Sequence, residues 1–171
     1  VRGAVTNVVV DTASGRVEGQ YLTLAGTLRN CSGGATPWGS WIACEEIVTR
    51  AGEDGAGREH GYNGEVPAAA RSLVEPRPLE AMGRFFHEAV AVDARTGAVY
   101  QTEDRADGLL YRFLPAERQR LAAGGRLQAL VIRALPGVST ANRRGMANTF
   151  AVGERHAVAW VDLDEVTSPN D

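Results

Sequence analysis

The sequence predicts an all-β protein built from consecutive β-propeller blades. Runs of alternating apolar and polar residues recur along the chain, and turns rich in glycine, proline or aspartate separate them. A hairpin signature, V-V-D-x-x-S-G-x-V at 9–17, returns as A-V-D-x-x-T-G-x-V at 91–99. Because propeller blades of the shorter kind contain roughly 40 to 45 residues, this offset corresponds to two blades. The spacing therefore favours a propeller over a β-sandwich.

The expected elements follow one another as short strands with a single helix. One short helix is expected at 115–123, because Pro115 suits a first helical turn and Gly124 suits a left-handed stop. A strand-like stretch at 157–162 matches the hairpin signature only in part, since it lacks the turn residues. Strands are expected at 5–11, 16–24, 40–48, 61–66, 87–93, 127–134 and 150–152.

Length and composition restrict the function classes. The chain has 171 residues, enough for one domain with a sizeable core, and its formal net charge is −3. Acidic and basic residues are interspersed, so the sequence indicates neither a nucleic-acid surface nor a membrane surface. No apolar run approaches the roughly 20 residues of a membrane span. The two cysteines, Cys31 and Cys44, allow at most one internal disulfide and do not fix a redox compartment.

The most specific stretch is N-C-S-G-G-A-T-P-W-G-S-W-I-A-C-E-E at 30–46. A turn of glycine and proline precedes a strand whose side chains alternate between two faces. Glu46 then lies on the largely apolar face of Ile42 and Cys44. A buried carboxylate is costly unless a cation, a metal or several donors meet it, so Glu46 is a candidate site residue.

Two further side chains join Glu46 as candidates. Cys31 lies across the glycine turn and could be brought back towards Glu46. Glu88 stands at the beginning of a later strand, on the same face as Val90 and Val92. Strand ends in a propeller converge on a central channel, so side chains that are distant in sequence can meet there.

These motifs resemble the PhoX-type alkaline phosphatases and the large bacterial family around them. The stretch at 30–46 is similar to the family signature N-C-x-G-G-x-T-P-W-G-T-W-x-x-C-E-E. The similarity extends over roughly residues 25–115, about half of the chain, with its motifs in the family's order. The further matches are H-G-Y at 60–62, H-E-A-V-A-V-D at 87–93, Y-Q-T-E-D at 100–104 and G-L-L-Y-R-F-L-P at 108–115.

The resemblance implies a metal cluster of ferric iron and calcium in the propeller channel. The positions that match the family's ligands are Cys31, Glu46 and Glu88. A thiolate suits iron, and carboxylate oxygens suit calcium. The implied reaction is metal-dependent hydrolysis of small phosphate monoesters by a periplasmic or secreted protein, although this chain carries no signal peptide.

The resemblance also bears on the extent of the domain. PhoX-like propellers are larger than the three to four blades that 171 residues can form, and the family's R-P-E type motif is not found here. We therefore expect residues 1–171 to be an internal fragment, a partial PhoX-like β-propeller domain. The full-length protein is then expected to be a phosphoric monoester hydrolase, and this fragment alone is expected to be inactive.

Other functions remain open at this point. A calcium-dependent lactonase-type propeller also uses channel carboxylates and would not need Cys31. A third reading is a non-catalytic propeller that binds ligands or partners, because a fold does not imply a function. Cys31 itself is alternatively a small buried residue or the partner of Cys44 in a disulfide.

Several other polar and aromatic residues have structural explanations. The acidic residues at strand ends are expected to pair with arginines or to accept hydrogen bonds there. The histidines are expected to be structural, and the tryptophans to belong to the core between stacked blades. The residues concerned are Glu45, Glu103, Asp104, His60, His87, Trp38 and Trp41.

Overall fold

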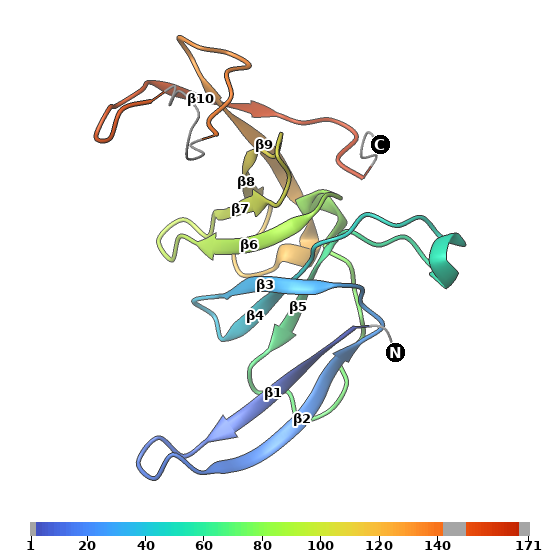
Figure 1. Ribbon diagram of the computed structural model, residues 1–171. Coiled ribbons are helices and arrows are strands. Elements are labelled where there is room, and N and C mark those ends of the chain that lie inside the picture. Colours follow the sequence, from blue (N-terminus) through green and yellow to red (C-terminus); the bar gives the residue numbers. More distant parts are fainter. Residues whose placement is uncertain (1–2, 142–149, 168–171) are drawn as a thin grey trace.

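The computed structural model describes residues 3–141 and 150–167, which form ten antiparallel strands and three short 3-10 turns. The strands fall into three sheets that follow one another along the chain (Figure 1). In each sheet, strands that are consecutive in sequence are hydrogen-bonded neighbours. Within these residues, no helix has the length and apolar character needed to cross a bilayer. The all-β class predicted from the sequence is confirmed.

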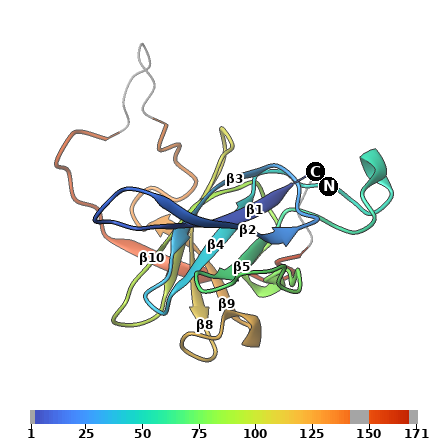
Figure 2. The same cartoon turned by 90° about the horizontal axis from the view of Figure 1, so that it is seen from below.

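The three sheets differ in size. The first contains β1 (Ala4–Val10) and β2 (Val17–Ala25). The second contains β3 (Asn30–Ala35), β4 (Ser40–Glu45) and β5 (Asn63–Pro67). The third contains β6 (His87–Val92), β7 (Val99–Glu103), β8 (Leu110–Pro115), β9 (Gly125–Ile132) and β10 (Val158–Asp162). The 3-10 turns are η1 (Glu53–Gly55), η2 (Glu80–Met82) and η3 (Leu121–Ala123). The segment that carries η1 projects away from the sheets (Figure 2).

Two apolar layers hold the sheets together, and β4 contributes to both. Ala43 belongs to a cluster with Leu24 of β2 and Val66 of β5. Ile42 and Cys44 belong to the larger cluster, which includes buried residues of β6, β7, β8 and β9. The alternation predicted for this strand is therefore confirmed, and the face of Ile42 and Cys44 packs towards the third sheet.

The repeated hairpin signature forms the same turn twice, between β1 and β2 and between β6 and β7. Asp11 accepts a hydrogen bond from the Ser14 hydroxyl, and Asp93 accepts one from the Thr96 hydroxyl at 2.6 Å. Each carboxylate also accepts a bond from the backbone N–H two residues further on, at 2.9 and 3.0 Å. These hydrogen bonds lower the pKa of both aspartates. The sequence repeat is thus a structural repeat.

The helix expected at 115–123 does not form. Pro115 is the last residue of β8, and only the single 3-10 turn η3 follows it. The backbone N–H of Ala116 donates to the carbonyl of Gly124 at 2.9 Å, which closes the connection between β8 and β9. Leu121 is buried in the core below this connection. Strand pairing and burial of Leu121 outweigh the local helix signals.

Two smaller expectations also differ from the structure. Residues 150–152 form no strand. The final described strand is β10, which pairs with β9 and lies within the stretch 157–162 that matched the hairpin signature in part. Trp38 packs against the larger core cluster, whereas Trp41 on the opposite face is 41% exposed. Trp41 therefore does not belong to a core between the described sheets.

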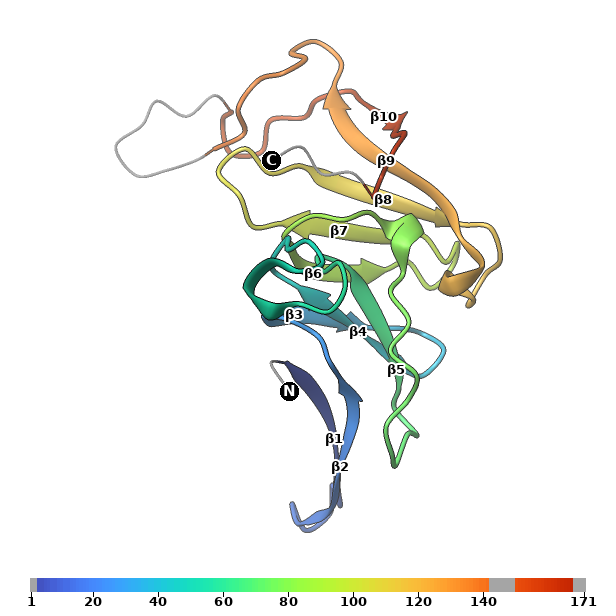
Figure 3. The same ribbon diagram turned by 90° about the vertical axis from the view of Figure 1, so that its right-hand side faces the viewer.

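The first strands of the second and third sheets, β3 and β6, lie next to each other (Figures 1 and 3). Gly34 of β3 makes this approach close, because a Cβ at this position would lie 2.2 Å from the backbone oxygen of Val90. No side chain fits in that space without moving one strand. The absence of a side chain at Gly34 therefore sets the separation of the two sheets.

Replacing Gly34 by alanine is expected to lower the free energy of unfolding by about 1–3 kcal/mol, because the added methyl group forces β3 and β6 apart. Gly57→Ala is the matched control, since nothing lies within 4 Å of a Cβ built at Gly57. Urea unfolding followed by tryptophan fluorescence measures both variants. Equal midpoints for the two variants would show that the approach of β3 and β6 is not constrained in this way.

Candidate metal centre

Cys31 and Glu88 occupy equivalent positions in neighbouring strands. Each is the second residue of the first strand of its sheet, β3 for Cys31 and β6 for Glu88. In both strands the pairing register shifts at this point, between residues 30 and 33 and between residues 87 and 90. An irregularity of this kind bends a strand and redirects a side chain, as β-bulges commonly do beside functional sites.

The irregularity in β6 corrects the expectation that Glu88 shares a face with Val90 and Val92. His87 and Val90 are both buried, although they are three residues apart, and Glu88 between them is only half-buried. The extra residue shifts the alternation, so Glu88 leaves the apolar face. Its carboxylate is turned towards Cys31 instead.

The structure brings Cys31, Glu46 and Glu88 together. One potential ligand atom from each of them lies within 4.8 Å of the other two. The thiol of Cys31 donates to the carboxylate oxygens of Glu88 at 3.4 and 3.5 Å. Glu46 directly follows the end of β4, and Arg29 contacts its carboxylate at 3.6 Å. Three residues from two sheets thus converge at one end of the strands.

The mutual proximity of these acidic groups favours their protonated forms. The hydrogen bond to Glu88 raises the pKa of Cys31, and partial desolvation and the negative charges of Glu88 and Glu46 act in the same direction. A hydrogen bond with Asp104 raises the pKa of Glu46, and Arg29 opposes this effect. A cation placed among these groups would relieve their repulsion.

Asp104 is the site neighbour that the sequence analysis missed. It was expected to pair with an arginine or to accept hydrogen bonds at a strand end, but its side chain faces Glu46. Its backbone N–H donates to the carbonyl of Phe86 at 3.0 Å. Asp104 directly follows β7 as Glu46 directly follows β4. The sequence carries a signal for this position: both C-E-E at 44–46 and T-E-D at 102–104 place two consecutive acidic residues at the end of a strand.

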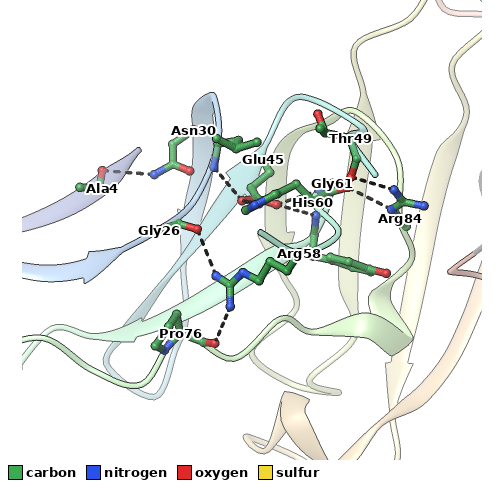
Figure 4. Close-up of polar contacts among 12 residues, drawn as sticks. Ala4, Gly26, Asn30, Glu45, Thr49, Arg58, His60, Gly61, Pro76 and Arg84 are labelled. Atoms are coloured by element: carbon green, nitrogen blue, oxygen red, sulfur yellow. Dashed lines mark hydrogen bonds and ion pairs between the residues drawn. The ribbon is translucent and has the colours of Figure 1, made fainter. Parts of the chain in front are cut away.

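Glu45, the neighbour of Glu46, has a structural role (Figure 4). It is buried, and it accepts backbone hydrogen bonds from Leu28 and Gly61 at 2.8 Å and from Tyr62 at 3.2 Å. Its carboxylate also contacts His60 Nδ1 at 2.8 Å. The carboxylate therefore ties the segments before β3 and before β5 to the end of β4.

The other residues given structural explanations behave accordingly. Glu103 accepts a hydrogen bond from the Tyr111 hydroxyl at 2.8 Å. His87 is fully buried, with Nε2 donating to the carbonyl of Gly83 at 3.0 Å, and burial lowers its pKa to about 4. The expectation of hydrogen-bonded strand ends and structural histidines is confirmed for Glu45, Glu103, His60 and His87.

The two cysteines lie in different environments and are not bridged. Both are free thiols, Cys31 exposed and Cys44 buried. Cys44 packs in the larger core cluster, and its burial raises the pKa of its thiol to about 12. The disulfide that the sequence left open is therefore absent, and Cys31 remains available as a ligand.

The donor set fits a metal ion in composition and in size. It combines a sulfur ligand with carboxylate oxygens, a mixture that suits iron through the thiolate and calcium through the carboxylates. The three ligand atoms lie within 4.8 Å of one another. Two ligands of one cation are separated by at most about twice a metal–ligand distance of about 2.4 Å, so this spacing is compatible with one shared cation.

The stacked antiparallel sheets and the cluster at their strand ends define a propeller-type protein with a candidate metal centre. The chain belongs to the family of the alkaline phosphatase PhoX, whose family model matches residues 4–171. The antiparallel sheets of residues 3–141 and 150–167 agree with the all-β class predicted from the sequence.

One solved structure is similar to this chain, Pseudomonas fluorescens PhoX in complex with vanadate, a transition state analogue. The similarity has a TM-score of 0.48 and 19% sequence identity, and it covers 71% of this chain and 29% of that chain. This chain therefore spans less than a third of the length of that protein. Among curated proteins, no match was found.

Thiol labelling is expected to distinguish the two cysteines. In the metal-free native protein, one thiol should react with Ellman's reagent, because Cys31 is exposed and Cys44 is buried in the core. Both should react in denaturant, and Cys31→Ser should abolish the native reaction. Two reactive thiols in the native protein would contradict the burial of Cys44.

The two adjacent glutamates are expected to have different roles. Glu45 should contribute to the stability of the metal-free protein, whereas Glu46 should not. Glu45→Ala should lower the free energy of unfolding by about 3 kcal/mol or more, since it leaves buried N–H donors without an acceptor. Glu46→Ala should not destabilise the metal-free protein, because it removes a repelling carboxylate from the cluster. Chemical denaturation in the presence of a chelator measures both variants. Equal losses of stability would place the two glutamates in the same structural role.

Proposed function

We propose that this protein is part of a metal-dependent phosphatase that hydrolyses small phosphate monoesters. The observation that supports the proposal is the convergence of Cys31, Glu46 and Glu88 in a chain of the PhoX family. In this proposal, residues 1–171 are a partial propeller domain, and the full-length protein acts in the periplasm or is secreted. The substrate is a small molecule, and neither a nucleic acid nor a membrane is a partner.

The metals proposed are iron and calcium, held by Cys31, Glu46 and Glu88. When bound, they would neutralise the charge of the phosphate and lower the pKa of the attacking oxygen. Cys31 supplies the soft ligand that distinguishes iron from calcium. The guanidinium of Arg29, 3.6 Å from Glu46, orients that carboxylate from the solvent side.

The alternatives are less well supported by the same geometry. A calcium-dependent lactonase-type propeller needs carboxylates only, yet here a thiol contacts a carboxylate of the cluster. A non-catalytic binding propeller needs no group of converging acids, which cost stability through repulsion unless a cation is bound. The thiol within the cluster therefore favours the phosphatase.

In the full-length protein, Cys31→Ser is expected to reduce the iron content more than the calcium content, because a hydroxyl is a poor substitute for a soft thiolate. Hydrolysis of p-nitrophenyl phosphate should fall on the order of 100-fold or more in Cys31→Ser and in Glu88→Gln, since metal ions supply several kcal/mol of transition-state stabilisation. Elemental analysis and a chromogenic assay at alkaline pH measure the two effects.

Glu18→Gln is the control for these variants, because Glu18 is exposed on β2, outside the cluster. It should retain the metal content and the activity of the unmodified protein. Unchanged iron in a folded Cys31→Ser variant would remove Cys31 from the site and favour the lactonase or the binding propeller. A metal-loaded protein that hydrolyses no phosphate monoester would overturn the proposed function.

A further inference from the structure

A cavity of about 440 Å³ is lined by Glu103 and Arg105, the two sequence neighbours of Asp104, whose side chain faces Glu46. Val48 of its wall lies two residues after Glu46, and Phe86 lies two residues before Glu88. The same backbone continues from both ligands into the cavity wall. The cavity wall therefore continues from the backbone segments that carry Glu46, Glu88 and Asp104.

The wall of the cavity is rich in aromatic and aliphatic groups. The Phe85 ring stacks on Tyr111, with centroids 4.2 Å apart. The guanidinium of Arg105 lies 5.5 Å from the centroid of the Phe86 ring, and both side chains line the cavity. Leu163, which follows β10, also belongs to the wall. The volume lies in the range of ordinary small-molecule sites, so an aromatic ring is an occupant of suitable size and chemistry.

The charged groups of the wall leave an excess of negative charge. Arg105 is paired with Asp107 at 3.2 Å, and Arg84 is paired with a carboxylate outside the cavity at 2.7 Å. Asp164 and Glu165 also line the cavity. Over residues 3–141 and 150–167, the side chains of Asp164 and Glu165 make no hydrogen bond or ion pair. An anionic occupant is therefore repelled, and a cationic one is attracted.

We propose that this cavity binds the alcohol portion of the phosphate ester and selects aromatic alcohols that are uncharged or positively charged. The inference rests on the proposed function, since the phosphate would be held at the cluster while its organic group enters the cavity. Phe85, Phe86 and Tyr111 provide the aromatic surface. Asp164 and Glu165 determine the preference for charge.

The first test measures binding without metals and without catalysis. Phenethylamine and 3-phenylpropionate are titrated into the metal-free full-length protein, because they share a phenyl ring and differ in charge. The amine should bind about tenfold more tightly than the acid, since two uncompensated carboxylates face the cavity. The double variant Asp164→Lys, Glu165→Lys should reverse this order. Glu18→Lys with Glu75→Lys changes the net charge equally on exposed positions outside the cavity and should leave the order unchanged.

The second test compares two esters in the metal-loaded protein. The kcat/KM for 4-(aminomethyl)phenyl phosphate should exceed that for 4-carboxyphenyl phosphate by about tenfold, and the double lysine variant should lose this ratio. Leu163→Trp fills the cavity and should lower kcat/KM for both aryl esters relative to methyl phosphate. Val161→Trp, on an exposed position of β10, is its control and should not change that ratio.

The outcomes separate the two proposals. If the protein hydrolyses the two charged esters with equal kcat/KM, the assignment of the cavity is wrong but the proposed phosphatase function is retained. The same conclusion follows if the protein hydrolyses the esters but shows no saturable binding of phenethylamine. Saturable binding of the amine in a metal-loaded protein that hydrolyses no ester overturns the proposed function. Binding of the amine that is unaffected by both Leu163→Trp and the double lysine variant places the amine elsewhere and also overturns the cavity assignment.

Discussion

The close approach of β3 and β6 is the constraint on which the candidate site depends. Gly34 allows the backbone of β3 to contact the backbone of Val90 in β6. Because Cys31 lies three residues before Gly34 and Glu88 lies two residues before Val90, this contact also fixes the distance between the thiol and the carboxylate. A site built from two sheets is only as well ordered as the packing between those sheets.

The candidate site combines two equivalent halves. Each half consists of a side chain at the irregular start of the first strand of a sheet and an acidic residue directly after the next strand. The second sheet provides Cys31 and Glu46, and the third provides Glu88 and Asp104. Each half alone offers too few ligands for a metal ion, so the site forms only where neighbouring sheets stack.

Stability and chemistry are divided between adjacent residues throughout the site. Glu45 satisfies buried backbone donors, whereas Glu46 faces the cluster. His87 is buried and hydrogen-bonded to the backbone, whereas Glu88 contacts Cys31. In both pairs, the inward residue holds the strand end in place while its neighbour is presented to the cluster. The repulsion between the acidic groups lowers stability, and the hydrogen bonds of Glu45 and His87 hold the strand ends in place against it.

The sequence by itself determined the all-β class, the repeated turns at Asp11 and Asp93 and the alternation along β4, because these follow from local patterns of two to five residues. It also identified Cys31, Glu46 and Glu88 through a family motif. Only the tertiary structure decided that Glu88 leaves the face of Val90, because the change of register depends on pairing with β7. The meeting of Glu46 with Asp104, and the formation of the cavity, likewise require the stacking of sheets that lie far apart in sequence.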